Sequence, residues 1–287
     1  MSTTSSALDG ALLGIRVVSL AINLPGPIAV SRLAALGAEV VKVEPPTGDP
    51  LVIVAPGWYA ELHERVKVVP LDLKQPDQRV ALDDLLAGAD LLLTAQRPSA
   101  LARLGLDRLE EQHPRLVHVE IVGHHGHLAE VPGHDLTYQA VHGTLQPPVM
   151  PTVPVADLLG AERAATTALA ALMARSEAGH GGRHRVALED AAHLAGGAVR
   201  HGLMGPGAPL GGAMPTYNIY ATADGHVALG AVEAHFAARV HEHIGTDSAD
   251  LEAAFGAHPT AVWEDLAARI DIPLVGIPHP NATHPGR

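Results

Sequence analysis

The stretch that decides the fold is residues 15–46, IRVVSLAINLPGPIAVSRLAALGAEVVKVEPP. Its first part, 15–21, is short, apolar and rich in β-branched residues, which is typical of a buried strand. Pro27 can open a helix, and Gly37 can close it. Residues 38–46 then give a second strand pattern that stops at two prolines. Strand, helix and strand at this spacing predict a βαβ unit and therefore a parallel sheet.

The same alternation continues outward from this unit. Further strands are expected at 66–73, 90–96, 115–123 and from 183, with helices at 76–89, 98–106 and 160–179. This order predicts an α/β fold with a Rossmann-like, doubly wound parallel sheet. The turn after the first strand lacks G-x-G-x-x-G, so NAD is not expected. Ligands of open α/β sheets bind at the carboxyl ends of strands, so the loops after strands one, two, four and five should surround one site.

The composition changes after residue 200. We expect a large domain over 1–200, a Gly/Pro-rich linker over 201–214 and a small α+β domain over 215–287. In the small domain, 217–232 reads as a hairpin that turns at Asp224–Gly225. Helices are expected at 233–245 and 261–270.

The overall composition excludes several classes of protein. With 287 residues, 47% of them hydrophobic, the chain can form two domains. A net charge of -12 argues against a nucleic-acid binder. Cysteine is absent, so there are no disulfides or thiolate metal sites. The first ten residues lack the pattern of a secretory signal, and no apolar run reaches membrane-spanning length, so we expect a cytoplasmic protein that does not enter the membrane.

Several stretches together point to a family. They are residues 24–50, LDLK at 71–74, RPSALARLGLD at 97–107, GHGGRHRVALEDA at 179–191 and YNIYATADGHVALGAVE at 217–233. In this order they resemble the family III CoA-transferases (the CaiB/BaiF superfamily), which include carnitine CoA-transferases, formyl-CoA transferase and α-methylacyl-CoA racemase. The resemblance implies an acyl-CoA substrate, a large CoA-binding domain, no cofactor beyond CoA, and an interlocked homodimer. Each active site would lie between the large domain of one chain and the small domain of the other.

The resemblance implies three catalytic residues. Asp157 matches the aspartate that attacks the thioester in the transferases and moves a proton in the racemases. It precedes an Ala-rich helix, whose free N–H groups could keep it ionised; the alternative is a plain N-cap. His134, in a G-H-D motif, matches the racemase branch, and histidine titrates near neutral pH. Asp135 could orient its ring. Glu233 matches a racemase glutamate that would hold His134 across the dimer interface; otherwise it is a helix-start glutamate, and His134 a surface histidine.

These residues favour racemisation of a 2-methylacyl-CoA, with His134 and Asp157 on opposite sides of the α-carbon. The enolate would need donors, for which the N–H groups at the start of the Asp157 helix are candidates. Two alternatives stay open. One is a CoA-transferase that works through an aspartyl-CoA thioester. The other, motivated by a chain shorter than usual for the family, is a non-catalytic or partner-dependent acyl-CoA binder.

Cationic side chains near the strand ends are candidates for contacts with the CoA phosphates, although each could be a solvated surface charge. We expect CoA to be bound by Lys42, Arg97, Arg103, Asp135 and Tyr138, with Lys74 a weaker candidate. A metal site is not expected. His124, His125 and His127 cluster in one loop, but His241 and His243 are two apart on a predicted helix and do not share a face.

Overall fold

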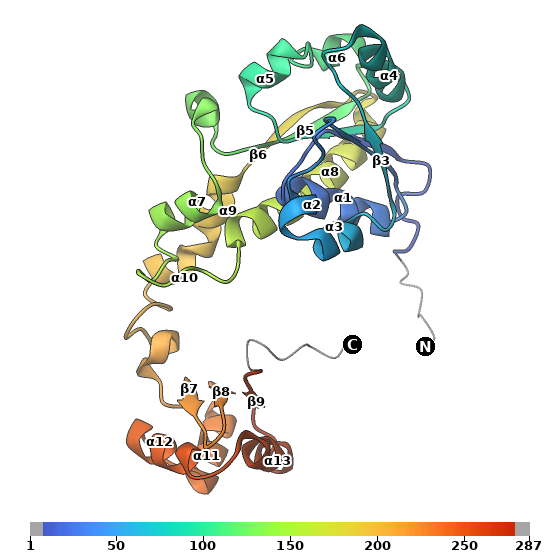
Figure 1. Ribbon diagram of the computed structural model, residues 1–287. Helices are drawn as coiled ribbons and strands as arrows, with labels where there is room; N and C mark the ends of the chain where they lie inside the picture. The colour runs from blue at the N-terminus through green and yellow to red at the C-terminus, as the bar shows by residue number, and fades with distance from the viewer. Residues whose placement is uncertain (1–7, 279–287) are drawn as a thin grey trace. The chain divides into compact units, whose positions relative to one another are not determined.

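A computed structural model describes residues 8–278 of the chain. Its internal contacts form two compact units that divide between Gly196 and Gly197 (Figure 1). The division falls just before the 201–214 segment that the sequence predicts as a linker. No helix within 8–278 combines the length and the apolar character that a bilayer crossing requires.

The first unit is built on a six-stranded sheet in which all neighbouring strands run parallel, in the order β3-β2-β1-β4-β5-β6. The chain reverses its direction of progress across the sheet between β1 and β4, which is the doubly wound Rossmann arrangement. The predicted fold class is therefore confirmed. The strands are β1 (Arg16–Ser19), β2 (Glu39–Glu44), β3 (Val66–Pro70), β4 (Leu91–Thr94), β5 (Val117–Val122) and β6 (Gly182–Ala187).

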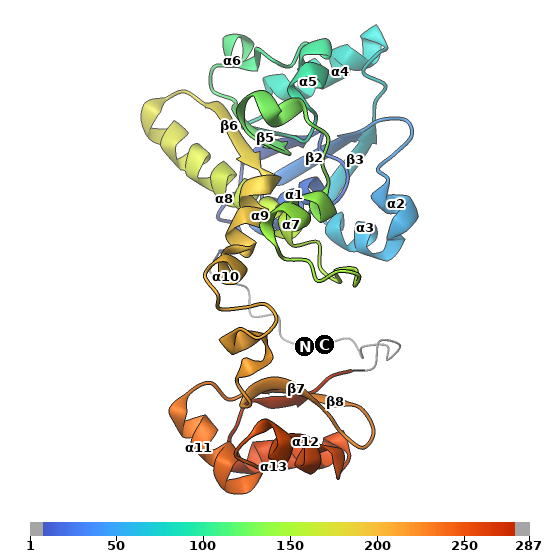
Figure 2. The ribbon, with the colours of Figure 1, turned by 90° about the vertical axis from the view of Figure 1, so that its left-hand side faces the viewer.

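Helices cover both faces of this sheet (Figures 1 and 2). Val17 and Leu91 pack toward α1 and α8, whereas Val18 and Leu92 pack toward α4, α5 and α6. Because both faces are covered, every residue of β4 and β5 is buried, including the polar His118 and Glu120 of β5. The helices of the unit are α1 (Pro25–Ala35), α2 (Leu51–Val54), α3 (Pro56–Leu62), α4 (Pro76–Ala87), α5 (Pro98–Arg103), α6 (Leu109–Gln112), the short 3-10 turn η1 (Gly126–Glu130), α7 (Asp135–His142), α8 (Val155–Ala178) and α9 (Leu188–Ala195).

Helix α8 begins earlier than the sequence predicts, at Val155 rather than residue 160. Pro154 is its N-cap residue, so the proline-rich stretch leads directly into the helix. Asp157 therefore lies in the first turn of α8 instead of before it. Gly160 brings α8 close to α9, because a Cβ atom at this position would lie 2.3 Å from Leu188 Cδ2.

The second unit contains a three-stranded antiparallel sheet, β7-β8-β9, with β7 (Tyr217–Ala221), β8 (His226–Gly230) and β9 (Leu274–Gly276). The predicted hairpin is confirmed as β7 and β8. Its core contains Tyr220 stacked on Phe255, which meets Trp263 edge-on. Its helical segments are α10 (Gly197–Arg200), the kinked turn η2 (Pro209–Ala213), α11 (Ala234–His243), α12 (Ser248–Gly256) and α13 (Thr260–Ile270).

Candidate active site

A pocket of about 240 Å³ opens in the first unit where β1, β4 and β5 end. This is the point at which the strand order reverses, the usual ligand position in such sheets. The loops after β1, β4 and β5 line the pocket, as the sequence predicts. The loop after β2, which the sequence also predicts to lie at the site, does not line it. The pocket is lined by Ile22, Asn23, Pro25, Ala95, Arg97, Ile121, Val122, Gly123, Ala129, Val131, Gly133, His134, Tyr138, Asp157 and Leu188.

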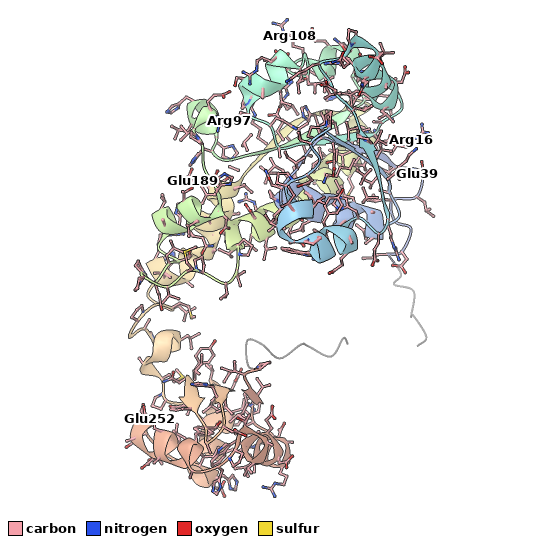
Figure 3. All side chains as sticks on the ribbon, in the orientation of Figure 1. Arg16, Glu39, Arg97, Arg108, Glu189 and Glu252 are labelled. Atoms are coloured by element: carbon pink, nitrogen blue, oxygen red, sulfur yellow. The ribbon has the colours of Figure 1, made fainter. Side chains whose placement is uncertain are left out.

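Four of the predicted site residues line this one pocket. His134 is the exposed N-cap residue of α7, and Tyr138 lies one turn further along that helix with only 2% of its surface exposed. Asp157 comes from the first turn of α8 and is half-buried. Arg97 is the exposed N-cap residue of α5 and is labelled in Figure 3. The site thus combines an imidazole, a phenol, a carboxyl group and a guanidinium.

Asp135 fastens helix α8 to helix α7. Its Oδ1 accepts the backbone N–H groups of Ala156 at 2.7 Å and Asp157 at 3.2 Å, and its Oδ2 accepts Gln139 Nε2 at 2.6 Å. No hydrogen bond in the described part of the chain joins Asp135 to the His134 ring. Asp135 therefore acts here as a cap for α8, rather than in the predicted role of orienting His134.

The expected oxyanion donors at the start of α8 are already occupied. Ala156 and Asp157 donate to Asp135, while the N–H of Leu158 donates to the carbonyl of Pro154. That expectation does not hold, because a bonded N–H cannot also serve an enolate oxygen. The start of α7 differs: within residues 8–278, the N–H groups of Asp135 and Leu136 have no acceptor.

The proton affinity of Asp157 also departs from expectation. Burial raises the pKa of its carboxyl group to about 7, and the nearby Asp135 carboxylate adds to the shift. From the sequence, N–H groups at the helix start could keep Asp157 ionised, but in the structure those of Ala156 and Asp157 donate to Asp135 instead. Near neutral pH, Asp157 is therefore present in both protonated and ionised forms.

Lys42 does not lie where a CoA phosphate could reach it. Its side chain is fully buried, with Nζ 2.5 Å from Asp49 Oδ2 and 2.8 Å from Glu44 Oε1. Asp49 Oδ1 in turn accepts the N–H of Asn23, a pocket residue with a left-handed backbone (φ 67°). The Lys42 network thus holds the loop after β1 in place, and the predicted phosphate contact is replaced by a structural one.

The other predicted residues lie outside the pocket lining. Arg103 is exposed in the last turn of α5, and Lys74 is exposed in the loop after β3. Glu233 is the exposed N-cap residue of α11 in the second unit, so its pairing with His134 stays a prediction.

Two of the three histidines that cluster after β5 contact carboxylates of α9. His124 Nδ1 lies 2.5 Å from Glu189 Oε2, and His125 Nε2 lies 2.9 Å from Asp190 Oδ2, which fastens the loop to α9. Among the residues that the structure describes, no group of three or more His, Asp and Glu side chains is arranged to hold a metal ion.

Taken together, the sheet and its pocket define a Rossmann-like α/β protein with a candidate site at the carboxyl ends of its strands. The model of the CoA-transferase family III matches residues 12–280. The chain therefore belongs to CoA-transferase family III, whose members act on acyl-CoA thioesters.

Curated relatives include both activities of the family. The chain is 37% identical over 139 residues to cinnamoyl-CoA:phenyllactate CoA-transferase of Clostridium sporogenes, covering 43% of this chain and 34% of that protein. It is 29% identical over 282 residues to alpha-methylacyl-CoA racemase of Mus musculus, covering 89% and 69%. The chain therefore matches only about a third to two thirds of the length of several of these relatives. Identities of this size do not separate racemase from transferase.

Solved structures show the same fold. A hypothetical protein from Mycobacterium tuberculosis superposes with a TM-score of 0.76 at 25% identity, covering 92% of this chain and 84% of that one. A CaiB/BaiF family protein from Brucella suis gives a TM-score of 0.80 at 23% identity, covering 94% and 85%.

Proposed function

We propose that the chain racemises or epimerises a 2-methylacyl-CoA by removing and returning the proton at C2. The observation that carries this proposal is that His134 and Asp157 line one pocket and that Asp157 can hold a proton at neutral pH. An acid and a base that face a common space are what proton transfer beside a thioester requires. The racemase relative matches over most of this chain.

In the proposed reaction, one of the two groups carries a proton at the start and the other does not. In one direction, His134 takes the C2 proton as Asp157 gives its own proton to the opposite face of the enolate. In the other direction, Asp157 takes the proton and the His134 imidazolium returns one. A carboxyl pKa of about 7 suits both roles, because neither protonated nor ionised Asp157 is then rare at neutral pH.

Binding of the substrate would use Arg97, whose guanidinium lines the same pocket and suits a CoA phosphate. We also propose that two chains form a homodimer in which Glu233 of the partner subunit contacts His134. In that assembly the glutamate would fix the orientation of the imidazole.

A CoA-transferase is the second candidate, supported by the 37% identity to the cinnamoyl-CoA:phenyllactate enzyme. There, ionised Asp157 would attack the thioester carbonyl and expel CoA thiolate, giving an acyl anhydride. The CoA thiolate would then attack the aspartyl carbonyl of this anhydride, which forms an aspartyl-CoA thioester and releases the acyl group as a carboxylate. The raised pKa of Asp157 lowers the fraction of this nucleophile at neutral pH.

The two candidates are separated by incubating the protein with 2-methylacyl-CoA esters in heavy water. Racemisation predicts deuterium at C2 together with inversion of configuration, measured by mass spectrometry and chiral analysis, and loss of the inversion in His134→Ala and Asp157→Asn. His125→Ala is the matched control, since this histidine pairs with Asp190 and does not line the pocket. Absence of exchange, together with a hydroxylamine-sensitive adduct at Asp157, would establish the transferase instead. Binding of CoA esters with neither result would indicate a binder.

A further inference from the structure

Tyr138 is a buried residue at the pocket wall, and its hydroxyl group makes no hydrogen bond within residues 8–278. Tyr138 is 2% exposed, yet no hydrogen bond among residues 8–278 uses its Oη. Tyr59 and Tyr220 contrast with it: their hydroxyls donate to Glu44 at 2.8 Å and to the Pro215 carbonyl at 2.6 Å. Buried tyrosine hydroxyls normally find a partner, so an unused one at a pocket wall indicates a ligand contact.

Two glycines make room for this hydroxyl at the pocket wall. A Cβ atom on Gly123 would lie 2.4 Å from Tyr138 Oη, and one on Gly133 would lie 2.5 Å from it. Both glycines line the pocket, and Gly133 directly precedes His134. The close approach of backbone from the β5 end and the α7 start therefore fixes the hydroxyl beside the proposed base.

The environment of Tyr138 keeps the hydroxyl protonated. Burial raises its pKa above the ordinary value, and the nearby carboxylates of Asp157 and Glu189 raise it further. A phenol that keeps its proton can donate a hydrogen bond but does not remove a proton from C2. Its chemistry thus suits an acceptor that gains negative charge.

We infer that Tyr138 Oη donates a hydrogen bond to the carbonyl oxygen of the acyl-CoA thioester and stabilises the enolate that forms on removal of the C2 proton. The inference rests on the proposed function for its catalytic part. It supplies a donor that the start of α8 cannot, because those N–H groups serve Asp135. A preorganised donor at a developing oxyanion is worth roughly 10²–10³ in rate.

The test is Tyr138→Phe, which removes only the hydroxyl. We expect kcat for deuterium exchange at C2 to fall by about 10²–10³ with little change in KM. Infrared spectra of acetyl-CoA labelled with ¹³C at the carbonyl should show a lowered carbonyl frequency on the wild-type protein and a return toward the free value on the variant. Tyr220→Phe is the matched control, because it removes a buried hydroxyl in the second unit.

The two readouts distinguish this inference from the proposed function. If wild-type protein exchanges the C2 proton and Tyr138→Phe does so at the same rate with the same carbonyl frequency, the role of Tyr138 is wrong and the racemase stands. If the wild type exchanges nothing, the racemase is wrong, and the carbonyl frequency alone decides whether Tyr138 donates. Failure of the wild-type protein to bind acetyl-CoA would overturn both.

Discussion

Asp157 carries a carboxyl group that the folded protein prefers to keep neutral, since burial and the Asp135 charge raise its pKa to about 7. The unfolded chain has no such preference, because there the carboxyl group has the ordinary aspartate pKa of about 3.9. Folding is therefore accompanied by proton uptake at pH values between about 3.9 and about 7. In that window the contribution of Asp157 to stability is greatest at low pH and is lost as the pH rises. The group that we assign to proton transfer is thus a source of instability in alkaline solution.

A first prediction follows for Asp157→Asn, which cannot ionise. Relative to the wild type, we expect the variant to gain stability at pH 8, on the order of 1 kcal/mol because the site is partly open to solvent, and to gain little at pH 4. Thermal unfolding at the two pH values measures this difference. An equal effect at both would show that Asp157 has an ordinary pKa.

A second prediction concerns the fully buried Lys42, which lies between Asp49 and Glu44. Lys42→Met leaves two buried carboxylates without their cation, so unfolding free energy should fall by about 3–5 kcal/mol in urea titration. The exposed Lys74 is the control, and Lys74→Met should change stability by less than about 0.5 kcal/mol. A stable Lys42→Met protein with a raised KM for CoA esters would contradict this structural role and would support the contact between Lys42 and a CoA phosphate that the sequence predicts.

The sequence predicts part of the site at this scale. His134, Asp157, Arg97 and Tyr138 do line one pocket, because each stands where a helix begins at the carboxyl edge of the sheet or within the turns that follow. Lys42 could not be placed by its strand position alone. The signal that identifies its partners is the acidic pair two and seven residues later, Glu44 and Asp49.

At the scale of elements, the first turn of α8 depends on a carboxylate from another helix. Asp135 accepts the N–H groups of Ala156 and Asp157, whereas Pro154 at the N-cap provides no side-chain acceptor. The position of Asp157 is therefore set by the contact between α7 and α8 rather than by α8 itself. Sequence patterns do not reveal such a cap, because its donor and acceptor are separated by more than twenty residues.

A third prediction is that Asp135→Ala removes this cap. Stability should fall by about 1 kcal/mol, as for loss of an N-cap residue, and the pKa of Asp157 should fall because a neighbouring negative charge is lost. The pKa can be followed by NMR titration of the carboxyl carbon. Asp247→Ala, which removes the side-chain cap of α12 in the second unit, should cost a similar stability and leave Asp157 unchanged. An unaltered Asp157 pKa in Asp135→Ala would contradict the account.

The strands of the first unit are predictable because strands covered on both faces are short continuous apolar runs, and the long helices because turn-forming residues mark their ends. The short helices α2 and α3 and the small-unit elements α12 and β9 are not predicted. All four residues of Leu51–Val54 are apolar, so the segment shows no helical periodicity. Ile53 is 81% exposed, so its apolar side chain does not mark a buried position. Strand β9 has only three residues, too few to show alternation.

At the scale of the whole molecule, the residues assigned to the reaction are divided between the two units. His134 and Asp157 belong to the first unit and Glu233 to the second. In the homodimer that we propose, these residues would come from different subunits, and no pattern within one chain reveals such an assembly.

A fourth prediction tests that assembly by subunit complementation. His134→Ala and Glu233→Ala proteins, each with low activity, are unfolded together and refolded as a mixture. If a site takes His134 from one chain and Glu233 from its partner, hybrid dimers contain one intact site and about a quarter of wild-type activity should return. A mixture that stays as inactive as its components would show that the two residues act within one chain, whereas full activity of Glu233→Ala by itself would show that Glu233 has no part in the reaction.

The most direct test of the two-base mechanism uses single enantiomers of a 2-methylacyl-CoA in heavy water. Each group should remove the proton from one enantiomer only, so Asp157→Asn should put deuterium into one enantiomer without inverting it. His134→Ala should do the same with the other enantiomer. The account predicts this reciprocal pattern of exchange without racemisation. Loss of exchange from both enantiomers in one variant, with full exchange from both in the other, would contradict it.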